Sequence, residues 1–304
     1  EISACLVGSE MCIRDRFFAV EILLVDVTLE KVAFGLGMSA TAAFVATAIK
    51  GEHMFYDIGA MQMNSTPSLM LFALLCGTAC GVVGALFRKG SQWAESHKPT
   101  GRSLMWQMPI AGLVTGLVSI VVPQVMGNGR AAAQLGFSTF IPETADTSDA
   151  AQSAASAAAS PWTFLAGSDG APGSVVNAGT PLELNRLWML LGVLALTFVA
   201  KALVTLMTIR SGASGGVLQP GIALGSTLGT MLGLLWLFVF PVDSVTACAL
   251  IGAAALLSAS QQAPLMAMCL VMELTEAPFE FFVPVGMAVA ASAFVSSGLL
   301  HRLG

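Results

Sequence analysis

A glycine-rich stretch between two apolar runs carries the residues best suited to bind a ligand. The stretch holds Gly212, Gly215 and Gly216, then Pro220, and the flanking runs span 188–209 and 222–240. Glycine lets backbone approach a ligand closely, and proline is well tolerated at a helix start, so a helix is predicted to begin near 217–220. Because a helix N-terminus presents free N–H groups and partial positive charge, the pattern favours a bound anion. A glycine-rich membrane loop without a ligand is the alternative.

Four charged side chains in or beside apolar runs are candidates for supporting an anion path: Glu21, Lys201, Arg210 and Glu273. Charges at membrane depth are costly and mark functional candidates. For Glu21, a place at the water boundary is an equal alternative. Lys201 is interpreted as pairing with an acid or a backbone carbonyl on a neighbouring helix, while the sharper hypothesis places its charge near the anion. Arg210 adjoins the glycine stretch and could act from the aqueous mouth.

Enzyme chemistry is not expected from this chain. His53, His97 and His301 fall in predicted loops or the terminal tail, without an HExxH pattern. Four of the six cysteines lie inside apolar runs and are interpreted as packing residues rather than disulfides or metal ligands. The sequence therefore predicts no catalytic residue, no metal site and no cofactor.

The composition defines the elements that must position these residues. The chain has 304 residues, 56% of them hydrophobic and 10% charged, whereas a soluble domain has about 25% charged residues. The apolar runs are continuous rather than alternating, which favours an all-α integral membrane protein over a β-barrel. Membrane lipid is an expected partner and nucleic acid is not, because the net charge of −5 is thinly spread. Helices are expected at about 32–49, 68–87, 104–125, 188–209, 222–240, 244–257, 265–274 and 279–299.

The segment SGASGGVLQPGIALGSTLG, residues 211–229, resembles the Gly-Gly-x-x-x-Pro anion-site motif of the CLC chloride channel and transporter family. Residues 258–275, which contain Leu-Val-Met-Glu273, resemble a helix pair of that family, and the Phe-x-x-Glu ending at Glu21 resembles another helix end. Residues 126–130 resemble its Gly-x-Gly segment. The similarity spans about 17–300 and implies a CLC-like bundle of tilted and broken transmembrane helices with a truncated inverted-repeat architecture. It implies that backbone amides after the paired glycines hold the anion, which gives the anion-binding set Gly215, Gly216, Val217 and Leu218.

The resemblance also implies a function. We expect transport of chloride or a similar small anion, as a channel or as an anion/proton exchanger. Exchangers of the family often have a second Glu after the first helix-end Glu, and here that position is Ile22. A homodimer in a prokaryotic plasma (inner) membrane is implied, with dimer-facing segments at about 32–49, 68–87, 262–274 and 279–299. The alternatives are another broken-helix secondary transporter, or a non-conducting truncated relative.

The beginning of the chain does not match the rest of the sequence. Within residues 1–16, VGSEMCIRDR resembles a translated sequencing adapter, so this segment is interpreted as a non-native leader, although it could also flank a first helix. Residues 17–304 are then a partial CLC-like transmembrane domain, with a low-complexity loop at about 137–180. Three pathway elements of the family are not found: the serine loop, the gate glutamate and the terminal tyrosine. A chain with half of an anion site is predicted not to conduct by itself.

Overall fold

The computed structural model describes residues 66–99, 103–127, 129–138, 184–212, 216–237, 240, 243–275 and 277–303. Glu21, the expected helix at 32–49, the leader and most of the low-complexity loop lie outside these residues. The described part is helical and contains no strand. Its elements are α4 (Pro67–Ser96), α5 (Ser103–Val121), η2 (Pro123–Val125), α6 (Arg130–Ser138), α8 (Leu184–Arg210), α9 (Leu218–Leu237), α10 (Val245–Gln261), α11 (Pro264–Thr275), η4 (Phe279–Phe281) and α12 (Phe282–Leu303).

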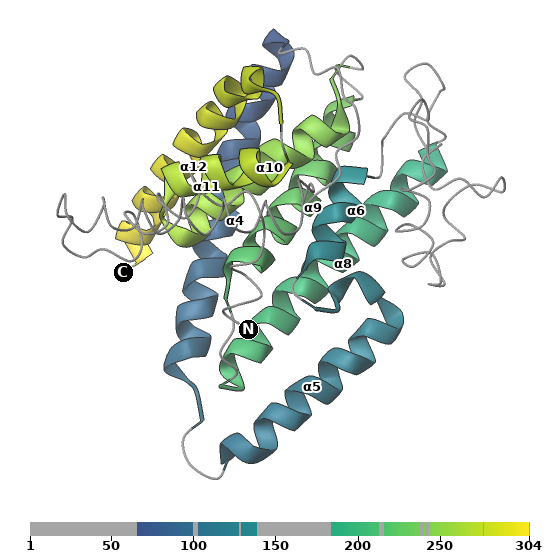
Figure 1. Ribbon diagram of the computed structural model, residues 1–304, viewed down its shortest axis with the longest axis vertical. Helices are drawn as coiled ribbons and strands as arrows, with labels where there is room; N and C mark the ends of the chain where they lie inside the picture. The colour runs from purple at the N-terminus through teal and green to yellow at the C-terminus, as the bar shows by residue number, and fades with distance from the viewer. Residues whose placement is uncertain are drawn as a thin grey trace, which may run out of the picture.

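Four of these helices are long and apolar enough to cross a membrane: α4, most of α8, α9, and the segment Phe279–Arg302. The apolar helices α10 and α11 are shorter, at 17 and 12 residues, and a span needs roughly 20. They lie almost directly one after the other in the chain and form a broken pair (Figure 1). The all-α integral membrane fold expected from the sequence is confirmed.

The structure corrects several predicted helix ends. The helix expected at 68–87 continues to Ser96. The expected span 104–125 stops at Val121, because Pro123 cannot donate to the helix ladder and instead opens the short helix η2. The break expected at Ser258 comes later, since α10 continues to Gln261. Gln262 then adopts a left-handed conformation with φ 58° and donates its amide to the Ser258 carbonyl.

Helix α6 was not predicted from the sequence. It occupies residues 130–138 and so overlaps the first two residues of the predicted low-complexity loop. Its nine residues form no long apolar run. The signal in the sequence was therefore too short to separate a helix from a loop.

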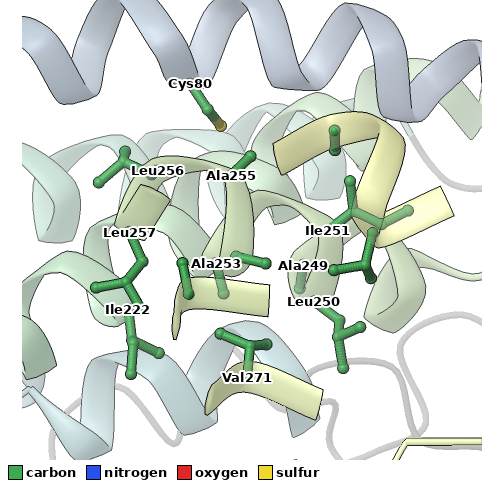
Figure 2. Packing of buried hydrophobic residues seen from close by; sticks show 14 of the residues in the cluster. Cys80, Ile222, Ala249, Leu250, Ile251, Ala253, Ala255, Leu256, Leu257 and Val271 are labelled. Carbon is green, nitrogen blue, oxygen red and sulfur yellow. The ribbon is translucent and has the colours of Figure 1, made fainter. Parts of the chain in front are cut away.

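Helix α10 is the centre of the bundle. It packs against α4, α9, α11 and α12, and every residue from Val245 to Ser260 is buried. Figure 2 shows its Ala and Leu side chains between Cys80 of α4, Ile222 of α9 and Val271 of α11. A helix that is apolar on all sides requires such an enclosed place.

Glycines let α9 approach α10 at backbone distance. Gly225, Gly229 and Gly233 are four residues apart on α9 and therefore share one face. A Cβ added at Gly229 would lie 2.5 Å from the Cys248 carbonyl oxygen and 3.0 Å from Cα of Gly252. Helices in a membrane associate without a hydrophobic driving force, and small residues let their backbones come close enough for van der Waals packing. This contact sets the position of α9 relative to the bundle.

A buried carboxylate joins three helix ends on the side where α4 begins. Asp243 lies just before α10 and accepts hydrogen bonds from the hydroxyls of Thr66 and Ser68 at the start of α4. Its other oxygen accepts from the indole N–H of Trp236 near the end of α9, at 3.0 Å. The carboxylate is therefore satisfied by neutral donors from two helices.

Substituting Gly229 by alanine is expected to destabilise the protein by about 1–3 kcal/mol, because the new methyl group meets backbone that cannot move aside. Thermal unfolding in detergent would measure the effect. Gly192→Ala on α8 is the matched control, since a Cβ there meets nothing within 4 Å. Equal melting temperatures for the two variants would contradict the close α9–α10 contact.

Candidate anion site

The chain leaves α8 in a short turn. Ser211 donates its amide to the Met207 carbonyl at 2.9 Å and its hydroxyl to the Thr208 carbonyl at 2.7 Å. Gly212 comes next with φ +83°, a conformation that favours glycine. Residues 213–215, and with them the predicted ligand residue Gly215, lie outside the described residues. The chain is described again from Gly216.

Helix α9 begins where the glycine-proline pattern predicted. Its first residue is Leu218, and the amide of Gly221 donates to the Val217 carbonyl at 3.1 Å to close the first turn. Pro220 lies in that turn, where it removes no needed donor. Gly216 is exposed, and a Cβ added there meets nothing within 4 Å. The first turn of α9 thus comes after a glycine that faces open space.

The first turn of α9 is held on two sides. On one side, a Cβ added at Gly221 would lie 3.2 Å from the Leu257 side chain and 3.2 Å from the Ser260 hydroxyl, both on α10. On the other side lies Gly129, which has φ +99°; a Cβ there would lie 3.0 Å from the Cβ of Ala223. These contacts orient the amides of the turn before any ligand arrives.

Lys201 secures the Gly127–Gly129 turn. Its side chain is 4% exposed, and its ammonium group donates to the carbonyls of Val125 and Gly127 at 2.8 Å each. Its Cε would lie 3.1 Å from a Cβ at Gly129. The interpretation that Lys201 pairs with backbone carbonyls is confirmed. The turn that it holds is the one packed against α9.

The other predicted charges have different surroundings. Arg210 is exposed, and its guanidinium carbon lies 5.4 Å from the centre of the Trp93 ring on α4. Glu273 is half-buried near the end of α11. Gly216, Val217 and Leu218 thus form one continuous segment at the start of α9. Lys201 contacts the Gly127–Gly129 turn, and that turn packs against α9. An effect of Arg210 or Glu273 on an anion stays a prediction.

Sequence reasoning missed several groups that complete the site's surroundings. Arg88 donates to the Ser260 carbonyl at 3.0 Å and so caps the end of α10. Hydroxyl groups perform the same task for α6, whose last carbonyls accept from Thr230 and Thr246. These contacts join residues 94 to 172 positions apart. A single sequence contains no local signal that pairs them.

No group of three or more His, Cys, Asp or Glu side chains within the described ranges could hold a metal ion. Cys76 and Cys80 are buried one helical turn apart on α4, with their sulfurs 3.8 Å apart. What the site offers instead is backbone: oriented N–H groups at a helix start, next to glycine. That arrangement suits an anion.

A bundle of spanning and broken helices around an interrupted helix start is the architecture of a membrane transport protein. The voltage-gated chloride channel family model matches residues 16–297, so the chain belongs to this family, also called CLC. Two solved structures share the fold: a slow cyanobacterial Cl⁻/H⁺ antiporter and a CLC-type fluoride/proton antiporter. Both are 18% identical to the chain, with TM-scores of 0.66 and 0.61.

The match covers 96% of this chain for the chloride/proton antiporter and 95% for the fluoride/proton antiporter. The chain spans 60% of the length of each of these two proteins.

Replacing Lys201 by methionine is expected to lower stability by about 1–3 kcal/mol, because the buried Val125 carbonyl and the part-buried Gly127 carbonyl lose their donor. Thermal unfolding would measure the change. The matched control is Lys98→Met, which removes an exposed pair with Glu95 that contributes at most about 1 kcal/mol. If both variants melt at the same temperature, Lys201 does not hold the Gly127–Gly129 turn.

Proposed function

We propose that this chain is part of a protein that transports chloride or a similar small anion across a membrane. The anion is held by the backbone amides of Val217 and Leu218, after Gly215 and Gly216. The observation that carries the proposal is the start of α9 at Leu218, two residues after Gly216, which is exposed. Membership in the chloride channel family, and the likeness in fold to a chloride/proton and a fluoride/proton antiporter, support it.

The physical basis is a set of oriented dipoles. The N–H groups of the first helical turn and the helix dipole favour negative charge at this end. The turn is already positioned by Gly221 and Gly129, so little ordering is required when an anion binds. Partial charges bind an anion strongly enough for it to enter and weakly enough for it to leave. Both a channel and a proton-coupled exchanger can use such a site.

The Gly216→Val variant tests this proposal in the full-length protein that contains this chain. Among the described residues, no atom lies within 4 Å of a Cβ at Gly216, so the variant is expected to fold, while its branched side chain occupies the space before the helix. Chloride flux into proteoliposomes is expected to fall at least about tenfold, the effect of losing about 1.4 kcal/mol.

Gly192→Val serves as the control, because a Cβ at that position on α8 also meets no described atom within 4 Å. Its neighbours Leu191 and Leu194 pack near Leu234, toward the end of α9 and not at its first turn. Flux of the Gly216→Val protein at the control level would refute the site. Halides should compete with chloride flux. Competition by carboxylates or amines alone would instead support another broken-helix transporter, and no flux from the full-length protein would support a non-conducting relative.

A homodimer in the plasma membrane of a prokaryote belongs to the same proposal. Helices α11 and α12 pack against each other (Figure 1). They expose large apolar side chains: Leu265 on α11, and Val283, Met287 and Phe294 on α12. Phe294 is 81% exposed. A second copy of the chain packed on this face would bury these residues.

The double variant Leu265→Ala/Phe294→Ala is expected to shift the equilibrium in lipid bilayers toward the monomer, because it removes two large side chains from the proposed interface. Single-molecule counting of labelled protein over a dilution series would measure the shift. Leu113→Ala on α5, a residue with 70% exposure, is the control for loss of an exposed apolar side chain. An unchanged dimer fraction in the double variant would exclude this interface.

A further inference from the structure

The last turns of helices α4 and α8 lie against each other. A Cβ added at Gly90 of α4 would lie 3.3 Å from the Leu206 side chain of α8. One turn further along, the Arg210 guanidinium lies over the Trp93 ring. The last turns of the two helices therefore form one continuous surface.

Each of these helices exposes an apolar stripe that leads to this surface. In a membrane protein such stripes face the lipid chains, and tryptophan and arginine at their ends lie at headgroup level. Trp93 is 53% exposed and continues the α4 stripe, and Arg210 is exposed and continues the α8 stripe. The stripes consist of Leu71, Leu75, Val82 and Leu86 on α4, and Leu196, Val199, Leu203 and Met207 on α8.

The donors of Arg210 are available to a ligand. A guanidinium carries five N–H donors in a planar fork that matches phosphate. Among the described residues, none accepts a hydrogen bond from Arg210; its contact is the face of the Trp93 ring. Trp93 in turn stacks on His97, at 4.9 Å between ring centres. The guanidinium is thus positioned by an aromatic ring and not neutralised by a described carboxylate.

Charge is unevenly distributed between the two ends of the bundle. At the end of the bundle where α4, α8 and α12 finish, the described residues include five basic side chains and one acid. The acid is Glu95, which pairs with Lys98. The described acids Asp243, beside the start of α4, and Glu280, just before α12, lie at the opposite end. A basic end favours the cytoplasmic side and an anionic leaflet. The basic residues are Arg88, Lys89, Lys98, Arg210 and Arg302.

We propose that Arg210, seated on Trp93, binds the phosphate of an anionic phospholipid headgroup at the end of α4 and α8. The guanidinium donates to the phosphate oxygens, while the exposed Trp93 ring and the end of the α8 stripe contact the glycerol and upper acyl chain. This site is separate from the proposed anion transport and does not depend on it. An arginine that only complements the dipole of α8 would affect stability without selecting lipid.

Native mass spectrometry of the full-length protein, titrated with phosphatidylglycerol or phosphatidylcholine, tests the proposal. Arg210→Gln is expected to weaken the tightest phosphatidylglycerol binding about fivefold, the contribution of one basic residue at an anionic surface. Phosphatidylcholine binding should not change. Arg210→Lys should fall between the wild type and Arg210→Gln, because lysine keeps the charge but loses the fork. Arg302→Gln, which removes another exposed arginine at the same end, should bind like the wild type.

Three outcomes would overturn the proposal. Unchanged phosphatidylglycerol binding in Arg210→Gln would remove the site, and equal losses in Arg210→Gln and Arg302→Gln would show a diffuse charge effect. Displacement of phosphatidylglycerol by millimolar inorganic phosphate would identify a free-phosphate site instead. Lipid binding is measured without transport, so a protein that carries no anion would leave this test intact. If the Arg210→Gln variant binds phosphatidylglycerol normally but shows reduced anion flux only at low ionic strength, the lipid site is excluded and Arg210 acts at the aqueous mouth of the anion path.

Discussion

Helix ends inside a membrane protein leave backbone groups that need partners, and the described structure depends on how this need is met. The carbonyl ends receive donors from side chains on other helices. Lys201 serves the turn after η2, Arg88 serves the end of α10, and threonines of α9 and α10 serve the end of α6. The amide end of α9 carries the opposite polarity. An anion is the ligand that matches it, which is why the proposed site lies there.

Close packing of small residues fixes the position of α9 relative to α10 and the rest of the bundle. Because Gly229 meets Gly252 at backbone distance, neither helix can move without the other. Gly221 then brings the start of α9 against the last turn of α10, where Arg88 of α4 binds the Ser260 carbonyl. The first-turn amides are therefore oriented by three helices and not by the loop alone. Such preorganisation lets weak dipoles select an ion.

The outward surfaces divide between two kinds of neighbour. The exposed large side chains of α11 and α12 are Leu265, Val283, Met287 and Phe294, and this is the face on which we propose that a second copy of the chain packs. The exposed stripes of α4 and α8 are also apolar, but they end in a tryptophan and an arginine that has no described carboxylate partner. A polar, positively charged end on an apolar stripe matches a phospholipid, which has the same order of apolar chain and charged headgroup.

The sequence alone determined the membrane class, most of the long helices, and the start of α9, because continuous apolar runs, glycine and proline act locally on the chain. The resemblance of residues 211–229 led to the family that the comparison then established. The sequence did not reveal α6, the extension of α10 to Gln261, or the role of Arg88. Only the tertiary structure decided which carbonyls Lys201 binds and that Arg210 lies on Trp93. These contacts join residues 74 to 117 positions apart, where no periodicity or composition in one sequence records which side chain meets which backbone group.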